Sequence, residues 1–145
     1  GIPEIITNGN DITVVSYGST CNLAIEAVKE LAALDISVEL IDVRTLLPFD
    51  TQHIIANSIK KTNRLLVVDE DVPSGATAFM LDKIVNEQNA YLYLDSKPQT
   101  LTAKEHRPAY STDGDYFSKP SIEDMVEKVY SIMHESNPIK YPSIY

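Results

Sequence analysis

The sequence has few of the residues that build disulfide, zinc or membrane-spanning structures. Cys21 is the single cysteine among 145 residues, which excludes a disulfide within the chain. The histidines, His53, His106 and His134, lie far apart and lack the spacing of zinc ligands. No apolar run approaches the ~18 residues of a membrane span, and no secretory signal opens the chain. We therefore expect a soluble protein of a reducing cytosol, without a membrane partner.

Positive charge is also scarce. Twelve Lys and Arg residues face twenty-one Asp and Glu residues, which gives a net charge of −9. Proteins that bind nucleic acid draw their affinity from clustered cations, so this balance argues against a nucleic-acid partner. Hydrophobic residues make up 43% of the chain, enough for the core of one domain.

The two ends of the chain differ in character from its middle. The chain starts with Gly1 rather than Met, and we interpret residues 1–10 as a linker from a missing upstream domain. We assign residues 11–135 to one domain. Residues 136–145 hold two prolines and two tyrosines, and we expect an extended tail rather than a helix.

Short apolar segments alternate with segments of helical period along the domain. This alternation predicts an α/β fold of three layers, in which helices cover both faces of a mainly parallel sheet. The predicted strands are Ile12–Tyr17, Ile36–Asp42, Arg64–Asp69, Tyr91–Asp95 and Leu101–Ala103. The predicted helices cover about residues 20–34, 51–61 and 76–87, and a last helix follows Ser121.

Several residues predict details of this fold. The continuous apolar run Arg64–Asp69 is typical of a strand at the centre of the sheet, and Glu39 indicates a strand face that is only partly covered. Asp50 can cap the helix that follows it. Ser121 and Asp124 have the spacing of a capping box at the start of the last helix.

Two candidate binding sites fall at the carboxyl ends of predicted strands. Gly18 and Ser19 follow the first strand, where free N–H groups could hold a phosphate, but a turn glycine with a capping hydroxyl explains the pattern better. Asp69, Glu70 and Asp71 could bind Mg²⁺, but we favour a solvated acidic loop at a helix start.

Two further residues are candidates for reactivity. His106 could act as an acid or base beside Glu105, but we favour an exposed loop histidine. Cys21 lies in a first helical turn, where the helix dipole would lower a thiol pKa, yet a small buried side chain is the better interpretation. We therefore predict no catalytic, cofactor-binding or metal-binding residues in this domain.

The order of motifs along the chain resembles a known family. The segment from Ile41 to Asp50, IDVRTLLPFD, followed by RLLVVDE from Arg64 to Glu70, is similar to the C-terminal domain of transketolase-like enzymes that use thiamine diphosphate. The similarity is greatest to the beta subunit of 2-oxo acid dehydrogenases. The later loop also resembles this family, with Glu105, Pro108 and Asp115 ahead of a proline at 120.

This resemblance implies a fold and a location for the cofactor site. The implied fold has a five-stranded, mostly parallel sheet with one antiparallel strand. In the family, thiamine diphosphate and Mg bind between the alpha subunit and the preceding domain of the beta subunit, so this domain binds no cofactor. The Asp113-Gly114-Asp115 run is not the family's cofactor motif. An isolated copy of the domain is therefore expected to be inactive.

The resemblance also implies partners. These are an alpha subunit and a second beta subunit in a heterotetramer, and the basic subunit-binding domain of a dihydrolipoyl acyltransferase. By this resemblance Asp115 and the terminal carboxylate of Tyr145 are the docking residues, while Arg44, Pro48 and Asp50 are structural. The implied compartment is the bacterial cytoplasm or the mitochondrial matrix.

Two other functions stay open from the sequence. One is the C-terminal domain of a transketolase or deoxyxylulose-phosphate synthase, and the other is a free-standing module that binds a phosphorylated ligand at Gly18. Within the dehydrogenases, the substrate could be pyruvate, a branched-chain 2-oxo acid or acetoin, and our expectation leans toward a branched-chain or general 2-oxo acid enzyme.

Overall fold

The computed structural model describes residues 1–70, 75–105 and 117–144. Its elements, in chain order, are β1 (Glu4–Thr7), β2 (Ile12–Ser16), α1 (Thr20–Ala33), β3 (Val38–Asp42), α2 (Ile54–Thr62), β4 (Leu65–Val68), α3 (Ala76–Asp82), the π-helical turn η1 (Lys83–Glu87), the 3-10 turn η2 (Ala90–Tyr93), β5 (Gln99–Leu101), β6 (Lys104–Glu105), β7 (Phe117–Ser118) and α4 (Ile122–Ser136). No helix in these ranges is long and apolar enough to cross a membrane.

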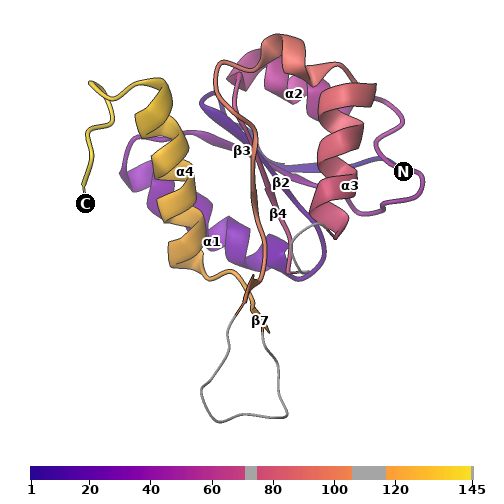
Figure 1. Ribbon diagram of the computed structural model, residues 1–145, viewed down its shortest axis with the longest axis horizontal. Coiled ribbons are helices and arrows are strands. Elements are labelled where there is room, and N and C mark those ends of the chain that lie inside the picture. Colours follow the sequence, from indigo (N-terminus) through magenta and orange to yellow (C-terminus); the bar gives the residue numbers. More distant parts are fainter. Residues whose placement is uncertain (71–74, 106–116, 145) are drawn as a thin grey trace.

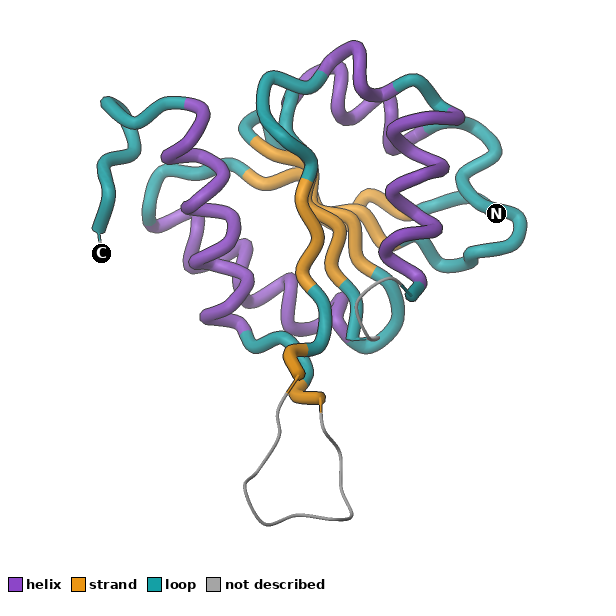
Figure 2. The backbone as a smooth tube through the Cα atoms, viewed as in Figure 1, coloured by secondary structure: helices purple, strands orange, loops and turns teal. Residues whose placement is uncertain are grey.

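A five-stranded sheet forms the middle layer. Its order is β1-β3-β2-β4-β5, and every pair is parallel except β1 with β3. Helices α1 and α4 cover one face, and α2 and α3 cover the other (Figures 1 and 2). The predicted α/β fold, with its mostly parallel sheet and one antiparallel strand, is confirmed.

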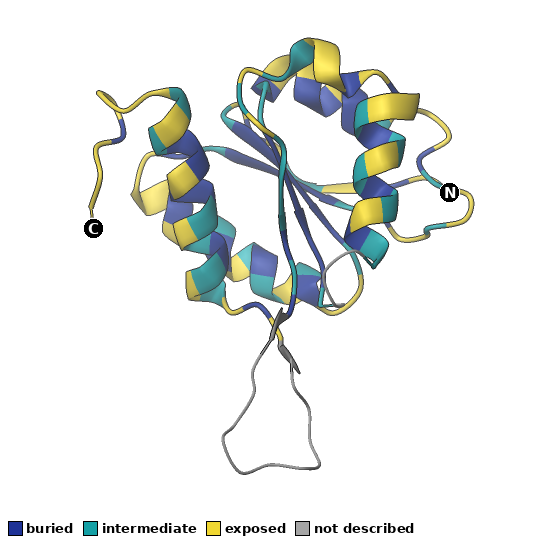
Figure 3. Cartoon of the chain, viewed as in Figure 1, coloured by how far each residue is buried: buried dark blue, intermediate teal, exposed yellow. Residues whose placement is uncertain are grey.

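Each face of the sheet has its own apolar core. Alternate strand residues such as Val14 and Leu66 pack with α1 and α4, while Val15 and Val67 pack with α2 and α3. All five residues of β2 and all four of β4 are buried, as Figure 3 shows in dark blue. This double coverage explains why β4 is a continuous apolar run, while β2 also buries the hydroxyl groups of Thr13 and Ser16.

The central strand is β2, not β4, so the prediction for Arg64–Asp69 is wrong on this point. Helices also cover both faces of β4, although it is the second strand from the edge of the sheet. A continuous apolar run therefore indicates a strand covered on both faces, not a strand at the centre of the sheet. The expectation for Glu39 is also wrong. Glu39 is only 2% exposed, because Lys61 of α2 supplies a partner for its carboxylate.

Residues 1–10, which we expected to be only a linker, contain the antiparallel edge strand β1. Glu4 is opposite Asp42 and Ile5 is opposite Ile41 in the pairing with β3. The segment is only four residues long and partly exposed, so it lacks the apolar pattern that predicted the other strands. Gly9, which follows β1, packs so closely on β3 that an added Cβ would clash with the backbone of Val38.

The predicted strand Tyr91–Asp95 is wrong, because this segment forms η2. Ala90 faces the core, while Tyr91 and Leu92 are exposed. This pattern has the three-residue repeat of a 3-10 turn, which a run of alternating Tyr and Leu conceals in the sequence. The last strand of the sheet is β5, which begins two residues before the predicted Leu101–Ala103 segment.

The helix starts follow the predicted capping chemistry. Ser121 and Asp124 form a reciprocal capping box at the start of α4, as predicted. Asp50 accepts hydrogen bonds from the first turn of α2, although the helix begins at Ile54 rather than near residue 51. The predicted third helix is α3 and η1 together.

The tail after α4 is neither helical nor extended: it turns at residues 138–140 and folds back onto α4. Tyr141 is buried, and its ring meets that of Tyr130 edge to face at 6.3 Å between centroids. Tyr130 donates a hydrogen bond to the carbonyl oxygen of Pro142 at 2.6 Å. Tyr141 provides the buried anchor that the prediction of an extended tail did not foresee.

Candidate functional site

The loop after β3 carries the motif residues Arg44, Pro48 and Asp50. Arg44 has a φ of 68°, and its backbone N–H donates to Asp42 at 2.9 Å. Its guanidinium lies 3.2 Å from the carboxylate of Glu4, so it connects this loop to β1. The hydroxyl of Thr45 donates to the carbonyl oxygen of Pro48 at 2.8 Å, which closes the loop on itself.

Asp50 is the buried anchor of this loop, with 1% of the residue exposed. Its two carboxylate oxygens accept from the backbone N–H groups of Ile54 and Ile55 at 2.8 and 2.9 Å. The side-chain amide of Gln88 donates to the same carboxylate at 3.1 Å. Asp50 therefore joins the loop, α2 and the end of η1 through charge-assisted hydrogen bonds.

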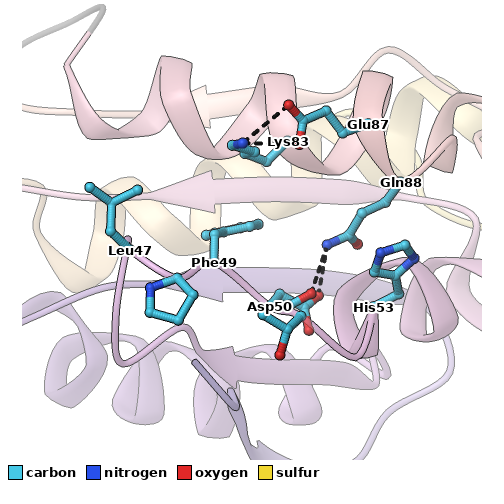
Figure 4. Close-up of a pocket in the computed structure, with 9 residues that line it drawn as sticks. Leu47, Phe49, Asp50, His53, Lys83, Glu87 and Gln88 are labelled. Atoms are coloured by element: carbon cyan, nitrogen blue, oxygen red, sulfur yellow. Dashed lines mark hydrogen bonds and ion pairs between the residues drawn. The ribbon is translucent and has the colours of Figure 1, made fainter.

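A pocket of about 370 Å³ opens beside Asp50 (Figure 4). Leu47, Pro48 and Phe49 form its apolar side, and the ion pair of Lys83 with Glu87 lies at its rim. Gln88 uses its amide N–H groups on Asp50 and its carbonyl oxygen on the N–H of Ala56. Because the polar floor is already bonded, this geometry suits a structural joint better than acid–base chemistry.

The carboxyl edge of the sheet brings Ser19 and Glu70 together. Gly18 has a φ of 70°, which glycine adopts without strain. Ser19 donates to Glu70 at 2.5 Å, and the ammonium group of Lys119 lies 3.2 Å from the same oxygen. The hydrogen bond from Ser19, followed by that from Lys119, lowers the pKa of Glu70. The carboxylate of Glu70 thus lies beside the start of α1 and already accepts the hydroxyl donor of Ser19 that a bound phosphate would need.

Cys21 is half-buried beside the hydroxyl of Ser16, with 3.0 Å between sulfur and oxygen. Burial raises the pKa of the thiol, and the nearby carboxylate of Asp42 raises it further. The dipole of α1 does not overcome these effects. Cys21 is therefore a packing residue and not an activated nucleophile.

A polar cluster that sequence reasoning missed lies between β2, β3 and α2. Glu39 accepts from the ammonium group of Lys61 at 2.6 Å and from the N–H of Gly9 at 3.2 Å. Beside them, the hydroxyl of Thr13 lies 2.7 Å from that of Ser58. No sequence motif links these residues, which are brought together only when α2 packs on the sheet.

Glu39 makes the stability of the protein sensitive to acid. Burial raises the pKa of this carboxyl, but the hydrogen bonds from Lys61, Ser58 and Gly9 outweigh burial and lower it below its ordinary value of 4.5. A lowered pKa stabilises the folded state above the unfolded pKa, and this stabilisation is lost as the pH falls through the folded pKa.

We expect Glu39→Gln to lose less stability than the wild type when the pH falls below about 4.5. Urea unfolding at a series of pH values measures this difference. Glu30→Gln, at an exposed residue of α1, is the control, and it should follow the wild-type profile closely. Parallel profiles for Glu39→Gln and the wild type would remove Glu39 as a source of acid sensitivity.

The tail forms a second contact network that sequence reasoning missed. Nδ1 of His134 donates to the carbonyl oxygen of Tyr141 at 2.7 Å. The N–H of Tyr141 donates to the carbonyl oxygen of Asn137 at 3.0 Å. The tyrosines at positions 130 and 141 were the available sequence signal for this contact. They form a buried aromatic pair only when the tail folds back onto α4.

We expect Tyr130→Phe to speed tryptic cleavage after Lys140, which lies in the turn of the tail. Loss of one hydrogen bond costs about 1 kcal/mol, so local opening should rise roughly fivefold. Mass spectrometry of the released peptide measures the rate. Tyr91→Phe, at an exposed tyrosine, should leave the rate unchanged. An unaltered rate in Tyr130→Phe would mean that the hydroxyl does not hold the tail.

The other candidate residues have no assigned site. His53 has a φ of 56° and lies at the rim of the Asp50 pocket. His106, Asp71, Asp115 and Tyr145 fall outside the described residues. Within residues 1–70, 75–105 and 117–144, no three His, Cys, Asp or Glu residues are grouped so as to hold a metal ion.

Residues 2–123 match the family described as "Transketolase, C-terminal domain". The chain belongs to this family. The matched residues include the whole five-stranded sheet and the loop from Asp42 to Asp50.

Curated relatives of this transketolase C-terminal domain are pyruvate dehydrogenase E1 beta subunits. The chain is 33% identical to the protein from Rhizobium meliloti over 135 residues, which is 93% of this chain and 29% of the relative. It is 41% identical to the protein from Acholeplasma laidlawii over 102 residues, which is 70% of this chain and 31% of the relative. It is 32% identical to the mitochondrial beta-1 protein of Arabidopsis thaliana, over 87% of this chain and 34% of the relative. The chain thus spans about a third of these relatives.

Solved structures agree on the fold. A split-gene transketolase, described as an inactive beta4 tetramer, superposes with a TM-score of 0.68 at 18% identity, covering 90% of this chain and 41% of the other. A 2-oxoglutarate:ferredoxin oxidoreductase from Magnetococcus marinus gives a TM-score of 0.58 at 16% identity, covering 90% of this chain and 19% of the other.

Proposed function

We propose that this chain is the C-terminal domain of the beta subunit of a 2-oxo acid dehydrogenase, in the component that decarboxylates the substrate. The observation that carries the proposal is the similarity to pyruvate dehydrogenase E1 beta subunits over most of the chain, within the transketolase C-terminal domain family. These relatives favour pyruvate as the substrate over a branched-chain 2-oxo acid.

The domain contributes assembly and not catalysis in this proposal. Its buried acids are engaged in structure: Asp50 caps α2, and Glu39 pairs with Lys61. Thiamine diphosphate, with Mg, would be held elsewhere in the enzyme and would supply the electron sink that decarboxylation needs. An isolated copy of the domain would then be inactive as an oxidoreductase.

The partners in this proposal are an alpha subunit, a second beta subunit and a dihydrolipoyl acyltransferase, within a multienzyme complex. Asp115 and the carboxylate of Tyr145 are the proposed docking groups for the basic subunit-binding domain of the acyltransferase. The net charge of −9 would speed the encounter with such a partner and orient it.

Co-purification tests this assembly. The intact source polypeptide that carries this chain is expressed together with the candidate alpha subunit, and the complex is weighed by native mass spectrometry. We expect a mass equal to two copies of each subunit. A polypeptide that assembles only with itself, and that transfers two-carbon units between sugar phosphates, would instead support the transketolase alternative.

A further inference from the structure

The loop between β1 and β2 contains the dipeptide Asn8-Gly9, in which a chemically labile side chain precedes a glycine. The side-chain carbonyl carbon of an asparagine can be attacked by the backbone nitrogen of the next residue. Glycine has no Cβ, so its nitrogen is the least hindered and its backbone is the most adaptable. Asn8 is the only asparagine in the sequence that a glycine follows.

Water reaches Asn8, whereas Gly9 is buried. Asn8 is exposed and borders a hollow of about 220 Å³, whose lining includes Ala32 of α1 and Val38 of β3. The N–H of Gly9 points into the protein interior and donates to Oε1 of Glu39 at 3.2 Å. The amide group that would react is therefore hydrated, while the nitrogen that would attack it is held by a hydrogen bond.

Hydrogen bonds on either side of this dipeptide also fix the loop to β3 and to the residue before it. The hydroxyl of Thr7 donates to the carbonyl oxygen of Val38 at 3.3 Å. The N–H of Asn10 donates to the hydroxyl of Ser37 at 3.1 Å. The contact of Gly9 differs from both, because its acceptor is a carboxylate and its donor is the attacking nitrogen itself.

The reaction at this dipeptide balances with water as the only co-reactant. The nitrogen of Gly9 forms a bond to Cγ of Asn8, its proton passes through solvent to the departing amide nitrogen, and ammonia leaves. Water then opens the five-membered imide at either of its carbonyl carbons. The products are aspartate and its isomer isoaspartate, in which the backbone runs through the former side chain.

We propose that Asn8-Gly9 is a site of spontaneous self-modification, and that the hydrogen bond from Gly9 to Glu39 controls its rate. While this bond is formed, the nitrogen is held toward Glu39, and close packing on the backbone of Val38 leaves the glycine little room to rotate. The reaction therefore proceeds through local opening of the loop, and the free energy of opening includes this bond.

The modification acts on the edge of the sheet. Isoaspartate at position 8 lengthens the backbone between β1 and β2 by one atom, and either product adds a negative charge one residue from the contact of Gly9 with Glu39. Strand β1 is held to β3 by a short antiparallel pairing that includes Ile5 opposite Ile41. Modified protein should therefore exchange the amide hydrogens of β1 faster than unmodified protein does.

The test ages the intact source polypeptide that carries this chain in warm, mildly alkaline buffer. Peptide mass spectrometry with electron-transfer fragmentation follows Asn8 and distinguishes the two products. A synthetic peptide of residues 4–14 gives the rate without the fold, and the folded protein should convert roughly tenfold more slowly, or slower still. Asn57, which is exposed on α2 and precedes a serine, is the internal control and should convert far less than Asn8.

Glu39→Gln tests the contact itself. The glutamine keeps the size of the side chain but offers Gly9 a neutral acceptor, so the bond weakens and conversion should be roughly fivefold faster. Lys61→Met is the matched control, because it removes the other partner of Glu39 and leaves the acceptor of Gly9 in place. This control should change the rate by less than about twofold. Circular dichroism checks that both variants are folded.

The outcomes test the site and its control separately. Wild-type protein that converts as fast as the peptide, or equal rates in Glu39→Gln and Lys61→Met, would overturn the role of Glu39. Absence of conversion at Asn8 in Glu39→Gln, over the time in which the peptide converts completely, would overturn the site itself.

Discussion

Replacing Asp50 with alanine is expected to lower the free energy of unfolding by about 3–5 kcal/mol. The substitution removes a buried carboxylate that accepts from the N–H groups of Ile54 and Ile55 and from the amide of Gln88. These donors are buried or partly buried, and leaving them without an acceptor adds a desolvation cost to the lost hydrogen bonds. Urea unfolding followed by circular dichroism measures the change.

Two companion variants show whether the carboxylate itself is responsible. Asp50→Asn keeps the shape and one acceptor oxygen, so it should fall between the alanine variant and the wild type. Asp82→Ala removes an exposed carboxylate on α3 and should stay within about 0.5 kcal/mol of the wild type. If Asp50→Ala behaved like Asp82→Ala, the loop after β3 would not depend on this anchor.

Lys61→Met is expected to lower the free energy of unfolding by about 2 kcal/mol. The change leaves Glu39, whose side chain is 3% exposed, without its ammonium partner. A fully buried pair would lose more, but the side chain of Lys61 is 44% exposed, so water partly compensates the remaining carboxylate. The loss should also shrink at acidic pH, where Glu39 becomes neutral in the variant.

The matched control is Lys29→Met, which breaks the exposed pair of Lys29 with Glu26 on α1. Exposed pairs contribute little, so this variant should lose less than about 0.5 kcal/mol. Thermal and urea unfolding of both variants side by side give the comparison. Equal losses in the two variants would show that burial of Glu39 has no special weight in stability.

Local chemistry and periodicity were sufficient to predict most of the fold. The apolar stripe of α4 and its capping box are encoded within a few residues of each other, so the sequence alone places this helix correctly. Strand β4 is likewise a continuous apolar run, and β2 is a short segment of mostly β-branched residues that leads to the turn at Gly18. Their order in the sheet is not a local property, and the prediction that placed β4 at the centre failed for that reason.

The errors fall where tertiary contacts override local pattern. Strand β1 is short and becomes ordered through its pairing with β3, and Tyr91–Asp95 alternates like a strand but forms a 3-10 turn. The tail contains two prolines, yet the burial of Tyr141 against Tyr130 determines its path. In each case the deciding partner lies ten or more residues away, beyond the reach of a sequence window.

The candidate sites divide in the same way. Asp50 was predictable as a cap because its partners follow within five residues. The link from Asp50 to Gln88 and the pairing of Glu39 with Lys61 were not predictable, since they join segments 38 and 22 residues apart. Two hollows beside α4 are lined by residues of β5, α4 and the tail, so they exist only in the folded chain.

The most direct test of the central claim is the release of CO₂ from pyruvate. The intact source polypeptide that carries this chain is purified with its alpha subunit, supplied with thiamine diphosphate and Mg²⁺, and given pyruvate with an artificial electron acceptor. We predict CO₂ release that requires both subunits, while the domain of residues 1–145 alone releases none. Absence of CO₂ from pyruvate and from branched-chain 2-oxo acids, in a complex that is folded and binds the cofactor, would contradict the assignment to a 2-oxo acid dehydrogenase.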